Sequence, residues 1–101
     1  MRIIVFFDLP VDTVSHRRSY RKFRKFLIRN GFIMMQESVY SRLLLNTTGV
    51  NVVMTQLEKN KPADGLVQVL SVTEKQFSRM VYLVGSSETE VINSTDRLVF
   101  I

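Results

Sequence analysis

The sequence predicts an α+β protein with a ferredoxin-like β-α-β-β-α-β order, in which two helices cover one face of an antiparallel sheet. Apolar runs rich in β-favouring residues alternate along the chain with two segments whose apolar residues recur at helical spacing. The length indicates one domain, because 101 residues suit a single compact core of about 100 to 150 residues. We therefore expect a single ferredoxin-like domain over residues 1–101.

The first strand is predicted at residues 3–7. These residues, IIVFF, form a continuous apolar run, which is typical of a central strand covered on both faces. The strand ends at Asp8, and Pro10 prevents it from continuing.

A helix is predicted to follow, because the apolar spacing changes from continuous to periodic. Asp12 or Thr13 can act as its N-cap, and residues 30–31 (Asn-Gly) end it as a C-cap. Its apolar residues recur three, three and one apart, as one stripe of a helix does: Tyr20, Phe23, Phe26 and Leu27.

Residues 32–45 predict one long strand, bent near its middle, because β-branched, aromatic and long apolar residues resume there without a helical stripe. A second helix is expected next, with Thr47 or Thr48 as its N-cap. Its buried face is predicted to consist of Val50, Val53, Met54 and Leu57. Residues 60–65 end this helix and turn the chain.

Two further strands are predicted at residues 66–72 and 80–84, separated by a short helical turn. The turn is indicated by Thr73 and Gln76, which have the spacing of a capping box. We assign the β-α-β-β-α-β order with residues 32–45 counted as one strand. Residues 97–101 are an additional apolar strand that must be buried on its own sheet or on a second copy, and we favour a homodimer.

Composition excludes several classes of protein. The chain has no Cys and a single His, so it has no disulfide framework, no thiolate nucleophile and no zinc site of the usual Cys/His kind. Its apolar start is far shorter than the ~20 residues of a membrane span, and we expect no membrane association and a cytoplasmic localisation. The formal net charge of +5 favours polyanionic partners.

The basic residues are concentrated in the first predicted helix. Seven of the 14 lie there, on the arc opposite the apolar stripe: Arg17, Arg18, Arg21, Lys22, Arg24, Lys25 and Arg29. No acidic residue occurs between Asp12 and Glu37. A solvated helix face usually alternates Glu with Lys or Arg, whereas here like charges repel at i, i+4 spacing. We therefore predict that this helix binds the phosphate backbone of a nucleic acid, a simple solvated face being the alternative.

Base recognition is not predicted. RNA-recognition modules of ferredoxin-like order stack bases on aromatic residues of a central strand, but residues 66–72 (LVQVLSV) contain no aromatic residue and no glycine. Phosphate contacts carry no base information, so binding should be independent of sequence. Arg42, in the predicted long strand, is a further candidate for neutralising phosphate, or else lies on an edge strand partly in solvent.

Asp8 is the candidate for metal chemistry. A carboxylate directly after a buried strand suits a hard cation such as Mg²⁺, which usually takes one or two protein carboxylates. One Asp8 would suffice only if a second copy met it across a twofold axis. The alternative is a turn residue that accepts backbone N–H bonds. His16 is a general-base candidate only as the sole histidine, and the alternative is a helix residue at the edge of the apolar stripe.

The chain as a whole resembles the CRISPR-associated protein two family, small subunits of the spacer-acquisition machinery. The resemblance is carried by IIVFFDLP, YRKFRKFLIRNGF, SVYSRLLLN and VTEKQFSRMVYLVG, which look like the type II-A branch. It implies a homodimer in which residues 97–101 of each chain cover the sheet of the other. It also implies a complex with dimers of a CRISPR integrase subunit, bridged by this protein, which holds the double-stranded DNA of the new spacer.

The resemblance implies a second possible activity, that of a Mg²⁺-dependent endonuclease of RNA or DNA with Asp8 as catalytic residue and metal ligand. The chain departs from some archaeal members, which have Arg where it has Met34 and Met35, and Tyr where it has Phe7. We therefore expect a mainly non-catalytic role in antiviral defence. A free nuclease and a small-molecule regulatory domain are the competing functions.

Overall fold

The computed structural model describes residues 1–86, and this part of the chain contains four strands and three helices. In chain order they are β1 (Arg2–Asp8), α1 (Val14–Arg29), β2 (Ile33–Gln36), β3 (Val39–Leu43), α2 (Thr47–Asn60), β4 (Leu66–Val72) and α3 (Glu74–Ser78). None of the helices in this described part is long and apolar enough to cross a membrane.

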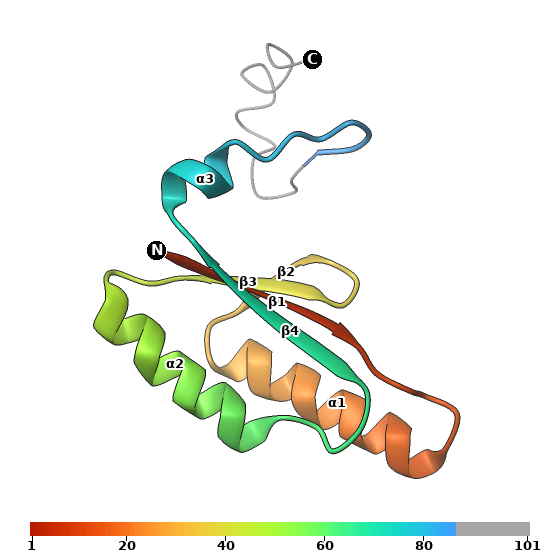
Figure 1. Ribbon diagram of the computed structural model, residues 1–101. Helices are drawn as coiled ribbons and strands as arrows, with labels where there is room; N and C mark the ends of the chain where they lie inside the picture. Colours follow the sequence, from red (N-terminus) through yellow and green to blue (C-terminus); the bar gives the residue numbers. More distant parts are fainter. Residues whose placement is uncertain (87–101) are drawn as a thin grey trace.

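The strands form one sheet in the order β2-β3-β1-β4, and every neighbouring pair is antiparallel. The long helices α1 and α2 pack on one face of this sheet, whereas α3 lies on the other side (Figure 1). This arrangement confirms the predicted ferredoxin-like α+β fold.

The core lies between the sheet and the two long helices. Alternate residues of β1 supply its centre, because side chains of a strand point to opposite faces in turn. Ile3, Val5 and Phe7 are buried there against α1 residues Phe23 and Leu27. The predicted apolar stripe of α1 is thus confirmed.

The prediction of one long strand over residues 32–45 is wrong. The segment is a hairpin, in which β2 and β3 pair with each other in antiparallel register. The reversal occurs at residues 37–38, where Ser38 adopts a left-handed backbone conformation with φ of 64°. A serine seldom adopts this conformation, and no Gly, Pro or Asn marks the turn, so the local sequence gives little sign of it.

The hairpin also changes the count of strands. With β2 and β3 separate, β4 is the fourth strand and completes the fold. Residues 80–84, predicted as a strand, form none, and Leu83 and Val84 are almost fully exposed. An apolar run indicates a need for burial but does not by itself supply a pairing edge. The predicted strand at residues 97–101 lies outside the described residues.

Helix α2 differs from the prediction at its start and on one face. Its N-cap is Asn46, whose side-chain oxygen accepts a hydrogen bond from the Gly49 amide at 2.9 Å, rather than Thr47 or Thr48. Asn is as good a cap as Thr, and the helix begins one or two residues earlier than expected. Of the predicted buried face, Val50, Val53 and Leu57 are buried, but Met54 is exposed at the margin of the stripe.

The short helix α3 is held against the start of β1. The predicted capping box is present, since Thr73 and Gln76 exchange hydrogen bonds between side chain and backbone. Arg2 makes a two-pronged salt bridge with Glu74, at 2.8 and 2.6 Å, and its guanidinium lies 4.0 Å from the ring centre of Phe77. This bond lowers the pKa of the Glu74 carboxyl. Arg2 therefore anchors α3 to the start of β1.

Candidate nucleic-acid interface

Helix α1 presents all seven of its predicted basic residues to solvent. Thr13 is its N-cap and accepts a hydrogen bond from the His16 amide at 3.0 Å, and Asn30 is its C-cap. With Phe23 and Leu27 buried against the sheet, the opposite side of the helix must face outward. The cationic face predicted from the sequence is therefore present and accessible in the described chain.

The basic residues of α1 divide into two groups according to their direction. The groove set faces the space between α1 and α2 and consists of Arg18, Lys22, Lys25 and Arg29. The outer set consists of Arg17, Arg21 and Arg24. At 100° per residue, its members point about a quarter turn away from the groove set.

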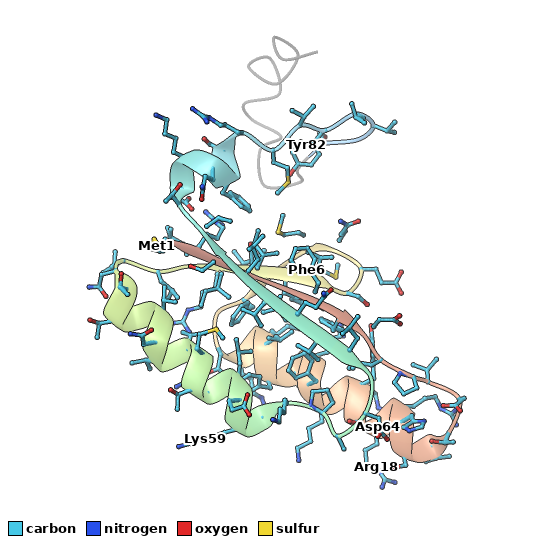
Figure 2. The ribbon with its side chains drawn as sticks, in the orientation of Figure 1. Met1, Phe6, Arg18, Lys59, Asp64 and Tyr82 are labelled. Atoms are coloured by element: carbon cyan, nitrogen blue, oxygen red, sulfur yellow. The ribbon has the colours of Figure 1, made fainter. Side chains whose placement is uncertain are left out.

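Two hollows lie between α1 and α2 on this side of the molecule. The larger, of about 350 Å³, is bounded by the start of α1 and the end of α2 with the loop after it. The smaller, of about 220 Å³, is bounded by the second half of α1 and Asn60. Lys22 and Asn60 line both hollows. Figure 2 shows Arg18 and Lys59 on the side of the two helices that faces away from the sheet.

Two members of the outer set are engaged within the protein. Arg17 donates a hydrogen bond from Nη1 to the Val11 carbonyl at 3.0 Å. Arg24 donates from Nε to the hydroxyl of the buried Tyr40 at 2.9 Å. These bonds fix the guanidinium groups close to the protein surface and use part of their donor capacity.

Arg42 lies on β3 and is half-buried. It is the register partner of Ile3, so it is on the helix-facing side of the sheet. Its side chain reaches the end of α1, where it lies beside Gly31 and lines a third hollow together with Arg29. The structure thus brings Arg42 to one end of the groove set.

The contribution of α2 to this surface was not predicted from the sequence. Lys59 and Lys61, at the end of α2, line the larger hollow opposite Arg18 and Lys22. The signal was visible in the sequence as Lys59-Asn60-Lys61 directly after the apolar stripe of the second helix. Only the antiparallel packing of α2 against α1 brings these lysines to the basic helix.

Asp8, the candidate metal ligand, is exposed at the end of β1. It pairs with Leu66 of β4, and by strand alternation its side chain lies on the sheet face opposite α1 and α2. The basic face of α1 and Asp8 are therefore on different sides of the sheet. Within residues 1–86, no group of three or more His, Cys, Asp or Glu residues has the arrangement of a metal site.

The model of the family described as CRISPR associated protein Cas2 matches residues 1–80. The chain belongs to the Cas2 family. A protein from Treponema denticola named CRISPR-associated endoribonuclease Cas2 is 56% identical over 99 residues, which are 98% of each chain. A Streptococcus mutans protein of the same name is 52% identical over all of this chain and 93% of its own. This similarity supports the type II-A-like branch indicated by the motifs.

The crystal structure of Streptococcus pyogenes Cas2 has the same fold. It superimposes on 83% of this chain and 100% of its own with a TM-score of 0.61, at 16% sequence identity. At this identity the likeness concerns the fold alone.

His16 of this Cas2 family member joins two loops rather than acting as an isolated base. Its Nδ1 lies 2.6 Å from Asp12 Oδ1, and its Nε2 lies 3.0 Å from Asp64 Oδ2. The hydrogen bond to Asp12, and then that to Asp64, raises the pKa of His16 above its ordinary value of 6.5. The bond from His16 lowers the pKa of Asp12 below 3.8. The imidazole ring of His16, between two carboxylates, thus fastens the start of α1 to the loop before β4.

We predict that this bridge stabilises the fold in mildly acidic solution and less so in basic solution. Since the folded pKa of His16 is raised, its contribution is complete below pH 6.5 and is lost as the pH rises through the folded value. The contribution of Asp12 is lost at the other end, as the pH falls below 3.8. Urea unfolding of wild type and His16→Gln should differ more at pH 5.5 than at pH 8.5. An equal difference at both pH values would contradict the bridge.

Proposed function

We propose that this chain is a subunit of CRISPR spacer acquisition that binds double-stranded DNA through the basic face of α1 and bridges copies of an integrase subunit. The observation that carries the proposal is the exposure of seven basic side chains on one helix, in a stretch of sequence with no acidic residue between Asp12 and Glu37. Family membership supports a role in CRISPR systems.

The charge pattern of α1 favours an anionic partner on physical grounds. Arg17 and Arg21, Arg18 and Lys22, and further pairs at i, i+4 repel each other by a few tenths of a kcal/mol, about 0.2–0.5 for each pair. A phosphate backbone relieves this repulsion and releases condensed counterions. Five of the seven residues are Arg, whose planar guanidinium suits two-pronged contacts with phosphate.

Duplex binding by the full chain tests this proposal. Fluorescence anisotropy with two labelled duplexes of unrelated sequence should give similar affinities, because phosphate contacts carry no base information. The affinity should fall steeply and linearly in a log-log plot against salt concentration, with a slope of about 0.9 per phosphate contact. A flat salt dependence, or binding of only one sequence, would overturn the proposal.

We further propose that the functional unit is a homodimer formed through the open sheet face, the face opposite α1 and α2. Strand alternation and register assign to this face Ile4, Phe6, Ile33, Leu43, Leu66 and Leu70. The last four are about half exposed. The same register adds four polar or charged residues to this face: Arg2, Asp8, Ser41 and Gln68. A sheet face with half-exposed apolar residues is a typical interface, and a twofold copy of the same face is its simplest partner.

The bridging role follows from such a dimer. Two copies place two basic helices on the outside of the assembly, because α1 lies on the side of the sheet away from the proposed interface (Figure 1). A rigid dimer with a duplex-binding surface on each half can hold DNA between two copies of an integrase subunit. Co-purification with the product of a neighbouring integrase gene tests the partner, and its failure under low salt would argue against bridging.

A second candidate function, endonuclease activity, is favoured by the exposed Asp8 and by the printed name of the relatives, endoribonuclease. Mg²⁺ usually requires one or two protein carboxylates together with phosphate and water oxygens. The described part of one chain offers Asp8 without a neighbouring group of ligands, so its residues alone do not fit a metal centre. Because Asp8 lies on the open sheet face, a second copy in the proposed homodimer would supply another carboxylate.

We predict that Asp8→Asn separates the two candidate functions. The substitution removes the anionic ligand but keeps the size of the side chain, and the basic face of α1 lies on the other side of the sheet. Duplex affinity and its salt slope should therefore be unchanged, within about a factor of two. Any cleavage that depends on Mg²⁺ should be abolished. Gel assays of cleavage and anisotropy on the same preparation provide the measurement. Loss of duplex binding in a folded variant would contradict the separation.

A further inference from the structure

The groove between α1 and α2 has the character of a binding surface for a chain of phosphate groups. It runs through the two hollows that share Lys22 and Asn60. None of the described residues that line these hollows is acidic. The hydroxyls of Ser15 and Ser19 and the amides of Asn30 and Asn60 add neutral polar groups along its length.

The groove set forms a single line along α1. Arg18, Lys22, Lys25 and Arg29 are spaced i, i+4, i+7 and i+11, which keeps them within a narrow arc of the helix. At 1.5 Å rise per residue, the line is about 17 Å long. Phosphates follow one DNA strand at about 3.4 Å of axial rise, so the line spans about five of them.

Helix α2 supplies the second wall. Lys59 lies in its last turn and faces the same hollow as Arg18 and Lys22. A lysine in the last turn of a helix also interacts favourably with the dipole of that helix, which is sufficient to explain a lysine at position 59. The helix dipole does not explain why four cations of α1 face the same groove. Lys61, by contrast, is paired with Glu58.

The outer set is less suited to binding phosphate groups. Arg17 and Arg24 already donate hydrogen bonds to Val11 and Tyr40 within the protein. A phosphate on that side would compete with these bonds, whereas one in the groove would meet cations from two helices. Charge from two walls also restricts the direction of a bound strand, which a single exposed helix face does not.

We propose that the groove between α1 and α2 is the track for the phosphate backbone of one strand of a bound duplex, held by the groove set and Lys59. This inference rests on the proposed function, that the chain binds DNA, and it specifies the surface and the residues. It assigns Lys59, on the second helix, a direct contact with phosphate and leaves Arg21 outside the track.

Two double variants with equal loss of charge test the track. Lys22→Ala with Lys59→Ala removes one cation from each wall. The matched control, Arg21→Ala with Lys75→Ala, removes one outer-set residue and one exposed lysine of α3. For a labelled duplex at 100 mM salt, the groove variant should bind roughly tenfold more weakly than wild type. Its salt slope should fall by about two units, and the control should lose less than half as much.

The outcomes distinguish this inference from the proposed function. If both double variants lose equal affinity and equal slope while wild type binds with a steep slope, the track is wrong and the proposed function stands. If wild type itself shows no salt-dependent binding, the proposed function fails. All four substituted side chains are exposed, so unfolding is not expected. The corresponding Gln variants, with circular dichroism as a check, keep the comparison decisive should an alanine variant misfold.

Discussion

Gly65→Ala is expected to lower the free energy of unfolding by about 3 kcal/mol or more. Gly65 has φ of +96°, a conformation that side chains rarely adopt. A Cβ at this position would lie 2.8 Å from Leu9 Cδ2 and 2.9 Å from the Asp8 carbonyl oxygen. The leucine methyl can move, but the carbonyl belongs to the end of β1 and cannot. The variant combines backbone strain with a clash against the sheet.

Gly31→Ala is the matched control, because it adds backbone strain without a steric clash. Gly31 has φ of +82°, yet a Cβ there would meet only the side chain of Arg42 at 3.5 Å, an ordinary contact. Its expected loss is about 1–2 kcal/mol, from the left-handed conformation alone. Urea unfolding of the three proteins, followed by circular dichroism, measures the difference. Equal losses for the two variants would show that the loop before β4 yields, and that its approach to Asp8 is not rigid.

Leu70→Asp is expected to convert the proposed homodimer to a folded monomer. Leu70 is 50% exposed on the open sheet face, in the edge strand β4 and opposite Ile4 of β1. Burying two carboxylates in a twofold apolar interface is strongly unfavourable, because an unpaired charge loses its hydration. Light scattering should report one chain, 11.7 kDa, in place of two. The monomer should keep its fold, since Leu70 is outside the core between sheet and helices.

Leu45→Asp provides the control for added charge. Leu45 is 96% exposed in the loop between β3 and α2, away from the open sheet face. The same leucine-to-aspartate change there should leave the mass in solution unaltered. If Leu70→Asp remains a dimer while wild type is a dimer, the open sheet face is not the interface. If wild type is itself a monomer, the homodimer proposal is wrong.

Local sequence signals were sufficient for the elements that carry strong periodicity or capping. The stripe that includes Phe23 and Leu27 determined α1, because an apolar face of period 3.6 has only one way to be buried. Thr73 and Gln76 determined the start of α3 through their own reciprocal hydrogen bonds. Signals of this kind lie within a few residues, so they persist whatever packs around them.

The predictions from sequence were wrong where contacts with a distant part of the chain determine the local structure. The hairpin at residues 37–38 depends on β3 pairing with β1, which holds Ser38 in a left-handed conformation that its neighbours do not indicate. Residues 80–84 are apolar but have no strand to pair with in the described chain, so the strand predicted from their composition does not form. Val53 is buried in the core and Met54 is exposed, and the apolar pattern of the sequence does not distinguish these two neighbours.

The sequence by itself determined the ferredoxin-like fold and the cationic face of α1, because charge and periodicity are properties of the chain alone. The tertiary structure decided where those charges lie relative to the other elements. Antiparallel packing of α2 on α1 turned one half of the basic face toward Lys59, and strand alternation placed Asp8 on the opposite side of the sheet. Which side chains of two elements face each other depends on how the elements pack, and no single segment of sequence contains that information.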